Sequence, residues 1–321
     1  MDKNAKIYVA GHRGLVGSAL MRQLRKQGYT NILARTHAEL DLTNQLAVQT
    51  FFKKEKPEYV FLAAAKVGGI HANKTYPAEF IFSNLAIQTN VIQQSYVNGV
   101  KRLMFLGSSC IYPRDCPQPI KEEYLLTGPL ELTNKAYALA KIAGVEMCGS
   151  YNRQYGTQNI AVMPTNLYGP GDNYDIEDNH VMPALIRKFH EAKTNNHPRV
   201  VIWGTGSPRR EFLYSEDLAE ACVYIAQLPS VRFENLLKAS SPLINVGYGE
   251  DLTIKDLALT IQKIIGFKGE IDFDVNRPNG TPRKIMDSTT INQLGWSPKV
   301  SLTDGIKMAY QDFLKNKNKN K

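Results

Sequence analysis

The sequence lacks any apolar run near the roughly 20 residues that a membrane-spanning helix needs. Its first residues, Met1 to Lys6, also lack the apolar core and cleavage site of a secretory signal. The four cysteines form no CxxC pair, so we expect neither a zinc site nor a disulfide framework. These absences favour a cytoplasmic protein that holds no metal.

Charge is not gathered into a surface that would bind nucleic acid. The formal net charge is +9, from 39 basic and 30 acidic residues. Four of the positive charges lie in residues 315–321, which we expect to form a flexible basic tail. No basic stripe with interleaved aromatic residues accompanies them, so we expect no nucleic-acid partner and no membrane partner. The remaining charge suits a ligand that carries phosphate.

Apolar strand-like runs alternate with helix-like stretches through the first half of the 321 residues. This alternation predicts an α/β fold with a doubly wound parallel sheet, covered by helices on both faces. The expected strands are residues 7–10, 32–34, 59–63, 103–106 and 160–163, and the expected helices are 16–27, 44–54, 80–97 and 135–155.

The pattern changes after Pro164, where a turn cluster follows at residues 169–173. Short strands expected at 200–203 and 271–273 indicate a smaller α/β substrate lobe. Ligands of open parallel sheets bind beyond the carboxyl ends of the strands, so we expect a cleft between the two lobes. The expected division is a nucleotide-binding domain at 1–170 and a substrate lobe at 171–314, with segments near 212–228 and 243–248 returning to the first domain.

Three glycines, Gly11, Gly14 and Gly17, follow the first expected strand at the start of a helix. The first permits a tight turn, the second lets backbone amides approach a pyrophosphate, and the third lets helix and strand pack closely. The helix N-terminus then favours the anion. This setting predicts a dinucleotide-binding domain of Rossmann type.

The residues that would distinguish NAD from NADP are basic. An NAD site usually carries an acid about 20 positions past the glycines, but here Arg35 follows the second expected strand. Arg13, inside the glycine loop, is a second candidate for the 2′-phosphate. The alternative is that both arginines are solvated surface residues. We expect NADP, with Asp41 and Leu42 flanking the adenine.

Tyr137 and Lys141 are four residues apart on an expected helix, so both project from one face. An ammonium beside a phenol lowers the pKa of the phenol, which can then exchange a proton with a carbonyl or alcohol oxygen. Ser108 lies just beyond the fourth expected strand and could donate to the same oxygen. The alternative is an ordinary aromatic residue and a solvated lysine.

Several longer runs together are similar to one group of enzymes. The chain resembles the extended short-chain dehydrogenase/reductase superfamily and, within it, the GDP-L-fucose synthase family. The resemblance implies 3,5-epimerisation and 4-reduction of GDP-4-keto-6-deoxy-D-mannose with NADPH. The runs that carry it are residues 10–14 (AGHRG), 63–70 (AAAKVGGI), 107–113 (GSSCIYP), 150–156 (SYNRQYG), 163–170 (MPTNLYGP) and 179–183 (NHVMP).

The same resemblance implies a role for each residue of the site. Cys110 is implied as the base and His180 as the acid, and both groups have pKa values that neighbours can move toward neutrality. Ser108 and Cys110 are two residues apart, so an extended backbone would project both side chains to one side. A homodimer through residues 80–97 and 135–155 is also implied. The implied substrate contacts are Asn166, Arg187, Trp203, Arg210 and, as a weaker candidate, Lys284.

Two other interpretations of the sequence remain open. A GDP-mannose 3,5-epimerase-like enzyme would use NAD, and it would need an acid after the second strand and a second lysine in place of His180. A nucleotide-sensing binding protein would keep the fold without catalysis, but such proteins typically lose the tyrosine or the lysine. One departure from the family is His37, which stands where a second basic residue is implied. Binding of the 2′-phosphate is therefore expected to depend on Arg35 and Arg13.

Overall fold

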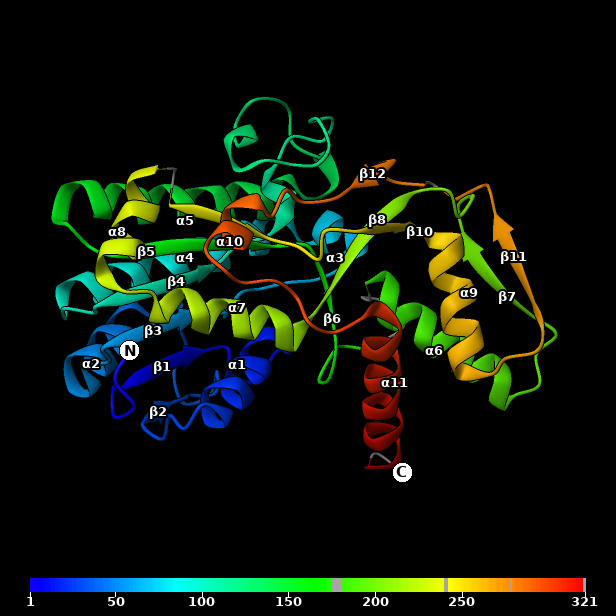
Figure 1. The fold of residues 1–321 in the computed structure, drawn as a ribbon, viewed down its shortest axis with the longest axis horizontal. Helices are drawn as coiled ribbons and strands as arrows, with labels where there is room; N and C mark the ends of the chain where they lie inside the picture. The colour runs from blue at the N-terminus through cyan, green and yellow to red at the C-terminus, as the bar shows by residue number, and fades with distance from the viewer. Residues whose placement is uncertain (175–179, 240–241, 278, 320–321) are drawn as a thin grey trace.

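The computed structural model describes residues 1–174, 180–239, 242–277 and 279–319. Its larger lobe holds a parallel sheet of six strands in the order β2-β1-β3-β4-β5-β9, which confirms the predicted fold class (Figure 1). The strands of this sheet are β1 (Ile7–Ala10), β2 (Ile32–Leu33), β3 (Tyr59–Leu62), β4 (Arg102–Leu106), β5 (Asn159–Pro164) and β9 (Leu243–Val246).

Helices cover both faces of this sheet because alternate strand residues face opposite ways. Ile7 and Val9 of β1 are buried in one core, together with residues of α1 and α7. Tyr8 and Ala10 are buried in the other, together with residues of α2, α4 and α5. The helices of the larger lobe are α1 (Leu15–Lys26), α2 (Gln45–Glu55), α3 (Ile70–Thr75), α4 (Pro77–Val97), α5 (Lys135–Tyr155), α7 (Ser215–Gln227), α8 (Ser230–Ala239) and α10 (Thr289–Gln293).

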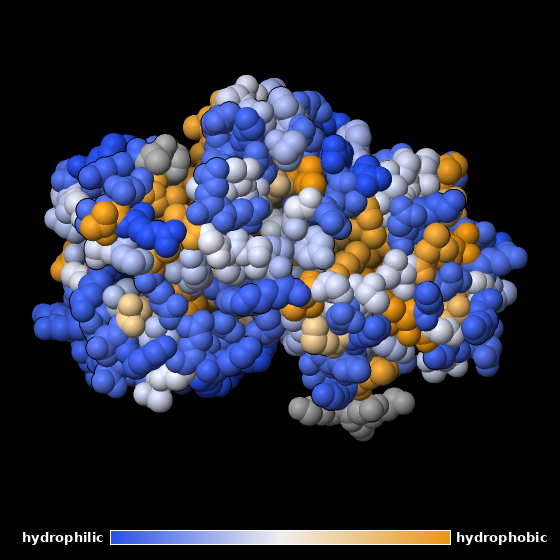
Figure 2. All heavy atoms as spheres, in the orientation of Figure 1, coloured by the Kyte–Doolittle hydropathy of each residue, from blue (hydrophilic) through white to orange (hydrophobic). Residues whose placement is uncertain are grey.

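The smaller lobe is built on two further sheets and has a core of its own. Strand β8 pairs with β10, β12 and β6, while β7 pairs with β11. Figure 2 shows apolar surface gathered where this lobe adjoins the rest of the molecule. Its elements are β6 (Asn166–Tyr168), α6 (Val181–Thr194), β7 (Arg199–Trp203), β8 (Arg209–Tyr214), β10 (Asp251–Thr253), α9 (Ile254–Ile265), β11 (Glu270–Asp274), β12 (Arg283–Lys284) and α11 (Leu302–Lys319).

The chain crosses between the lobes more than once. After the small lobe begins, α7 returns to pack against α1, and β9 adds to the edge of β5. The strand order reverses at β1, because β2 lies on one side of it and β3 on the other. Ligands of doubly wound sheets bind beyond the carboxyl end of such a switch point. The glycine loop after β1 therefore lies where a dinucleotide is expected.

Local signals explain where several helices begin and end. Thr253 caps α9 by accepting a hydrogen bond from the amide of Asp256 at 3.0 Å. Helix α5 ends at Gly156, whose φ of +68° is the left-handed conformation that favours glycine. Helix α4 begins at Pro77, three residues before the expected start, because proline is tolerated in a first turn.

The C-terminal segment begins as helix. Helix α11 continues to Lys319, so the first five residues of the expected tail are helical, and the last two lie outside the described residues. Within the part of the chain that the structure describes, no helix is both long enough and apolar enough to cross a membrane.

Candidate active site

The loop after β1 has no space for a side chain at Gly11 or at Gly17. Gly11 has φ +83°, and a Cβ there would lie 2.7 Å from the amide nitrogen of Ala64. A Cβ at Gly17 would lie 2.0 Å from the carbonyl oxygen of Gly11. Gly14 is the N-cap of α1 and contributes no side-chain cap, which leaves the first amides of the helix open to an anion. Among the described residues, the buried Nδ1 of His12 has no hydrogen-bond partner.

These observations fit a dinucleotide pyrophosphate at the N-terminus of α1. The loop supplies backbone amides, glycines that have no side chain, and the buried Nδ1 of His12, which lacks a hydrogen-bond partner. A buried polar atom without a partner is costly, so a ligand group or a water molecule is expected to satisfy it.

The two arginines of the cofactor end are partly neutralised by the protein itself. Arg35 is half-buried, and its Nη2 lies 3.2 Å from Oε1 of Glu55. Glu39 accepts hydrogen bonds from the amide of Thr36 at 2.7 Å and from its hydroxyl at 2.8 Å. These bonds lower the pKa of Glu39, and the nearby charges of Arg35 and Arg13 lower it further. Arg13 and Arg35 therefore both lie close to one carboxylate.

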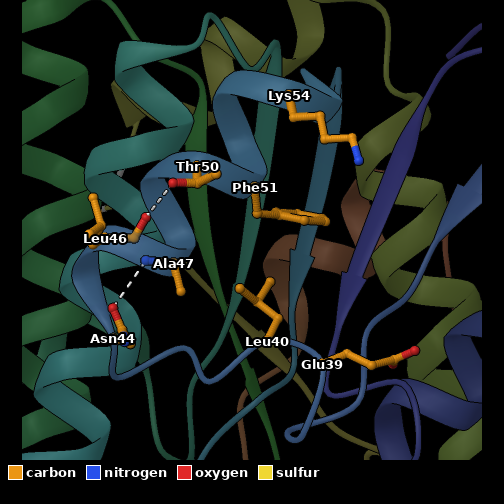
Figure 3. Close-up of a pocket in the computed structure, with 8 residues that line it drawn as sticks. All are labelled: Glu39, Leu40, Asn44, Leu46, Ala47, Thr50, Phe51 and Lys54. Carbon is orange, nitrogen blue, oxygen red and sulfur yellow. Dashed lines mark hydrogen bonds between the residues drawn. The ribbon is translucent and has the colours of Figure 1, made fainter.

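A hollow of about 430 Å³ lies beside α2, close to these arginines. Figure 3 shows that Leu40 and Phe51 point into this hollow, while the carboxylate of Glu39 points away from α2. The hollow is therefore lined by both apolar and polar side chains, since Asn44, Thr50 and Lys54 line it together with Leu40 and Phe51.

Asp41 and Leu42, the expected adenine neighbours, follow β2. Asp41 is half-buried and accepts hydrogen bonds from the amide and hydroxyl of Thr43 at 2.9 and 2.8 Å, which lower the pKa of its carboxyl group. Leu42 is buried. Nε2 of the exposed His37 lies 3.7 Å from Oδ1 of Asp41.

Four of the five predicted catalytic residues, Ser108, Cys110, Tyr137 and Lys141, come together at the carboxyl end of β4. Ser108 follows this strand, and Cys110 lies in a 3₁₀ turn, η1 (Ser109–Ile111). The backbone there is a turn and not the extended segment expected, because the amide of Ile111 bonds to the carbonyl of Ser108 at 3.2 Å. The two side chains nevertheless interact, since hydrogen bonding from Ser108 lowers the pKa of the Cys110 thiol.

Lys141 is fixed beside Tyr137 on α5. Its Nζ donates a hydrogen bond of 2.8 Å to the carbonyl of Leu106, the last residue of β4. The same atom lies 5.8 Å from the centre of the Tyr137 ring and 4.7 Å from that of Phe105. The ring of Phe80 packs edge-on against Tyr137 at 6.3 Å. The YxxxK spacing thus places both residues against the edge of the sheet, as predicted for one helix face.

Burial sets the proton affinities of this group. Burial lowers the pKa of Lys141 from 10.5 to about 8, although the nearby Cys110 opposes that change. Burial also raises the pKa of Tyr137, and hydrogen bonding from Ser108 lowers it only in part. The expected lowering of the Tyr137 pKa is therefore wrong, because loss of hydration outweighs the hydrogen bond from Ser108. Tyr137 is a neutral phenol, a form that can give a proton.

Two further cations reach the same place from the small lobe. Strand β12 pairs with β8 in parallel, with Lys284 opposite Arg210. Both side chains are half-buried, and burial lowers both pKa values. Lys284 interacts electrostatically with Cys110 and Cys116 as well as with Arg210. The role of Lys284 as a weaker candidate for a substrate contact remains a prediction.

The other predicted substrate residues belong to the small lobe and its edge. Asn166 donates a hydrogen bond of 2.8 Å to the carbonyl of Glu211. Arg187 lies on α6, where it bonds to Glu191 at 2.8 Å and to the carbonyl of Tyr174 at 2.6 Å. Trp203 is exposed at the end of β7. These three assignments remain predictions.

His180 is the N-cap of α6, and its side chain is exposed. Its carbonyl accepts the amide of Ala184 at 3.1 Å, which is the first hydrogen bond of the helix. Asn179, which precedes it in the quoted run, lies outside the described residues. The acid role of His180 also remains a prediction.

Glu211 is a residue that the sequence reasoning missed. It is fully buried, and its carboxylate accepts hydrogen bonds from the amides of Tyr248, Gly249 and Met286 at 2.6 to 2.9 Å. It thereby joins β8, the loop after β9 and the end of β12. An acidic residue inside an apolar strand run is the one signal that could have indicated it. Its neighbours in the sheet, Arg210 and Lys284, depend on this junction for their positions.

The sheet, the glycine loop and the Tyr137–Lys141 pair define a class of nucleotide-dependent epimerases, dehydratases and reductases. Residues 7–235 match the model of the NAD dependent epimerase/dehydratase family, and the chain belongs to that family.

Close relatives narrow this class. The chain is 58% identical over 316 residues to putative GDP-L-fucose synthase 2 of Arabidopsis thaliana, covering 98% of this chain and 94% of that protein. It is 50% identical over 317 residues to the GDP-L-fucose synthase of Escherichia coli, covering 98% of each. The solved structure of a GDP-mannoheptose C4 reductase from Campylobacter jejuni, with NADP bound, is 46% identical with a TM-score of 0.89, covering 98% of this chain and 99% of that one.

Proposed function

We propose that this protein is a GDP-L-fucose synthase, which converts GDP-4-keto-6-deoxy-D-mannose to GDP-L-fucose by 3,5-epimerisation and 4-reduction. The relatives' names support the activity and the substrate, at 50 to 58% identity over nearly the whole chain. One observation in the structure carries the proposal. The Cys110 thiol interacts with both Tyr137 and Lys141, so a candidate base lies at the pair that handles a carbonyl oxygen.

NADPH is the proposed cofactor, and it supplies the hydride for C4 when it is bound. The glycine loop and the N-terminus of α1 would hold its pyrophosphate, and Arg13 and Arg35 its 2′-phosphate. Lys141, Asp41 and Leu42 are proposed to contact the rest of the cofactor. The NADP-bound relative of known structure supports this choice.

Epimerisation requires that protons leave and return at two carbons beside one ketone. The C4 ketone acidifies the hydrogens at C3 and C5, because the resulting enolate places its charge on oxygen. Ser108 and Tyr137 can donate hydrogen bonds to that oxygen. Cys110 as thiolate removes a proton from carbon, and His180 as imidazolium returns one on the opposite face. Burial raises the pKa of the Cys110 thiol, and the nearby charges of Lys284 and Lys141 oppose that rise.

The reduction then uses the same oxygen. Tyr137 gives its phenolic proton to the C4 oxygen while the carbon is reduced, which suits the neutral form that burial favours. Lys141 stabilises the phenolate that remains, because its ammonium lies beside the ring. Two epimerisations and a reduction can therefore use one ketone and one set of side chains.

The GDP part of the substrate is proposed to bind along the small lobe. Arg210, Arg187 and Trp203 are the candidates for the diphosphate and guanine, and Asn166 for the sugar. Guanidinium groups suit a diphosphate because they offer paired donors in one plane. Arg210 is the strongest of these candidates, since it is opposite Lys284 and near the reaction centre.

We also propose that the enzyme is a homodimer formed through α4 and α5, which pack side by side. Their outer surface exposes Phe82, Tyr96 and Tyr155, and the rings of Tyr96 and Tyr155 stack at 4.1 Å. Exposed aromatic groups of this kind favour burial against a second copy. Light scattering after size exclusion tests this, and a monomer alone would contradict it. A cytoplasmic location fits four cysteines that all remain free.

Product analysis tests the proposed activity. The protein is incubated with GDP-4-keto-6-deoxy-D-mannose and NADPH, the loss of NADPH absorbance is followed, and the product is identified by NMR. We expect NADPH loss that matches the formation of GDP-L-fucose. A C4-reduced sugar that keeps the manno configuration at C3 and C5 would indicate a simple reductase. Epimerised sugar without NADPH loss would favour the GDP-mannose 3,5-epimerase-like alternative, and no reaction would favour a binding protein.

A further inference from the structure

Strand β12 is only two residues long and lies at the edge of a sheet in the small lobe. It stands at the end of the strand order β10-β8-β12, next to β8 (Figure 1). Lys284 of β12 lies opposite Arg210 of β8 in this pairing. So short a strand is held only weakly by its own pairing, and further contacts are needed to keep Lys284 opposite Arg210.

The two faces of this sheet carry different groups. Residues that are directly opposite on neighbouring strands point to the same face, and successive residues of one strand point to opposite faces. Arg210 and Lys284 therefore share one face, and both are predicted substrate contacts. The other face carries four charged residues, which are Arg209, Glu211, Asp251 and Arg283. Contacts on this second face can fix the strands whose other side holds the predicted contacts.

The carboxylate of Glu211 ties β8 to the end of β12. Its Oε1 accepts hydrogen bonds from the amides of Tyr248 at 2.6 Å and Gly249 at 2.7 Å, and its Oε2 accepts one from Met286 at 2.9 Å. Glu211 is fully buried, while both arginines of its face form ion pairs with Asp251. The bond to Met286, two residues after Lys284, therefore anchors the end of this short strand.

The backbone of Glu211 also holds a third predicted contact. Its carbonyl oxygen accepts a hydrogen bond of 2.8 Å from Nδ2 of Asn166. Glu211 is thus linked to Asn166 by its carbonyl, to Arg210 by a peptide bond, and to the strand of Lys284 by its carboxylate. One buried residue connects all three segments, which are distant in the sequence.

We propose that Glu211 is a positioning residue for the nucleotide-sugar, which sets the affinity for the GDP part by holding Asn166, Arg210 and Lys284 in one arrangement. It acts through these side chains and does not contact the ligand, because its carboxylate lies on the opposite face of the sheet from Arg210 and Lys284. The identity of the ligand rests on the proposed function. Contacts to a diphosphate are made before and during the reaction alike, so their loss should raise KM and leave kcat unchanged.

Glu211→Gln breaks one of the three bonds and keeps the size of the side chain. The amide oxygen can still accept the amides of Tyr248 and Gly249, but the NH₂ group would face the amide of Met286, and two donors cannot bond. We expect the KM for GDP-4-keto-6-deoxy-D-mannose and the Kd for GDP to rise about tenfold. The kcat and the KM for NADPH should stay within about twofold of the native values. Initial rates and calorimetry with GDP measure these constants.

The matched control is Asp217→Asn. Asp217 is also buried, and its Oδ2 accepts the amides of Lys299 at 3.1 Å and Val300 at 2.9 Å. The change neutralises a buried carboxylate that holds a different loop, so it should leave the KM and Kd values unchanged.

Gly247→Ala is a second, independent variant. A Cβ at this position would lie 2.4 Å from Oε1 of Glu211, so the methyl group would displace the carboxylate without removing its charge. We expect the same two constants to rise as in Glu211→Gln. This variant also tests the proposal if Glu211→Gln does not fold.

The possible outcomes distinguish positioning from a role in the fold alone. Unchanged KM and Kd in Glu211→Gln, with a lower free energy of unfolding in urea, would overturn the proposal. Equal rises in the KM values for the sugar and for NADPH, or a fall in kcat alone, would also overturn it. Weaker binding of GDP by Glu211→Gln, in a protein whose native form makes no GDP-L-fucose, would support the proposal and contradict only the proposed function.

Discussion

Positive side chains have acidic partners at the cofactor end of the candidate site and none at its chemical end, among the residues that the structure describes. At the cofactor end, Arg35 is paired with Glu55, and both Arg35 and Arg13 lie near Glu39. At the chemical end, Lys141 and Lys284 are buried or half-buried, and among the described residues neither has an acidic partner. A solvated and paired cation can release its partner to a ligand at little cost. An unpaired buried cation stabilises any anion beside it much more strongly.

We therefore expect the two ends of the site to have different roles. The cofactor has to bind reversibly. The arginines at the cofactor end interact with carboxylates of the protein, and the 2′-phosphate of a cofactor can take the place of those carboxylates. In the proposed mechanism, negative charge forms at the chemical end on sulfur, on the enolate oxygen and on the phenol in turn, and the unpaired cations there are available to stabilise it. Substitutions at the chemical end should therefore change rates by large factors, and those at the cofactor end should change cofactor affinity by small ones.

The largest effect is expected from Cys110→Ser. Replacing the thiol with a much weaker acid removes the base, so deuterium uptake from solvent at C3 and C5 should fall by about 10³-fold. NMR of the recovered keto-sugar without NADPH measures this. Cys116→Ser is the control, and it should retain nearly full exchange. Normal exchange in Cys110→Ser would remove the cysteine from the base role.

Tyr137→Phe should affect the second half of the reaction more than the first. The phenylalanine keeps the ring that packs on Phe80 but has no proton to give. We expect hydride transfer to slow by about 10²-fold and exchange by less than about tenfold. Single-turnover NADPH oxidation and deuterium uptake, measured on the same preparation, provide the two rates. Equal loss of both would contradict separate roles for Tyr137 and Cys110.

Lys141→Met tests the buried charge through stability. The pKa of Lys141 is about 8 in the folded protein against 10.5 ordinarily, so between these values the unfolded chain binds more protons. The stability of the native protein relative to the variant should therefore rise with pH in this window, by about 2 kcal/mol between about pH 7.5 and 9.5.

Urea unfolding of both proteins at the two pH values measures this change. The control is Lys135→Met, which is exposed at the start of the same helix and should show little dependence on pH. If the difference in unfolding free energy between the native protein and Lys141→Met is the same at both pH values, that result would contradict a lowered pKa of Lys141 in the folded protein.

The smallest effects are expected at the cofactor end. Arg35→Ala should raise the KM for NADPH about tenfold, because a charged contact to phosphate is lost. Glu39→Gln should lower it about twofold, since a carboxylate near both arginines is neutralised. NADH, which has no 2′-phosphate, is the control and should be nearly unaffected by either change. A change in KM for NADH of equal size would place Arg35 outside the 2′-phosphate site.

Features set by local spacing could be predicted from the sequence. The strand at residues 7–10, the glycine loop and the helix from Lys135 to Tyr155 all match the structure. Tyr137 and Lys141 meet because a helix turn brings residues four apart onto one face. Each of these depends on periodicity or on turn chemistry within about 20 residues, a range in which sequence patterns are informative.

Features set by distant pairing could not be predicted. Lys284 lies opposite Arg210 only because β12 pairs with β8, and the segment after β12 is bonded to residues 118–120. Glu211 is satisfied by amides from two separate loops, and no local pattern encodes those contacts. The pKa of Tyr137 was misjudged for the same reason, since burial by packed neighbours outweighs the lysine one turn away. Long-range packing determines the electrostatics of this site.

The central claim is that one carbonyl meets both the thiol and the phenol in a single site. The most direct measurement is a conversion of GDP-4-keto-6-deoxy-D-mannose by the native enzyme with NADPH in deuterated water, with the product examined by NMR. We expect GDP-L-fucose that carries solvent deuterium at both C3 and C5 and hydrogen from NADPH at C4. A reduced product with no deuterium at C3 and C5 would contradict it.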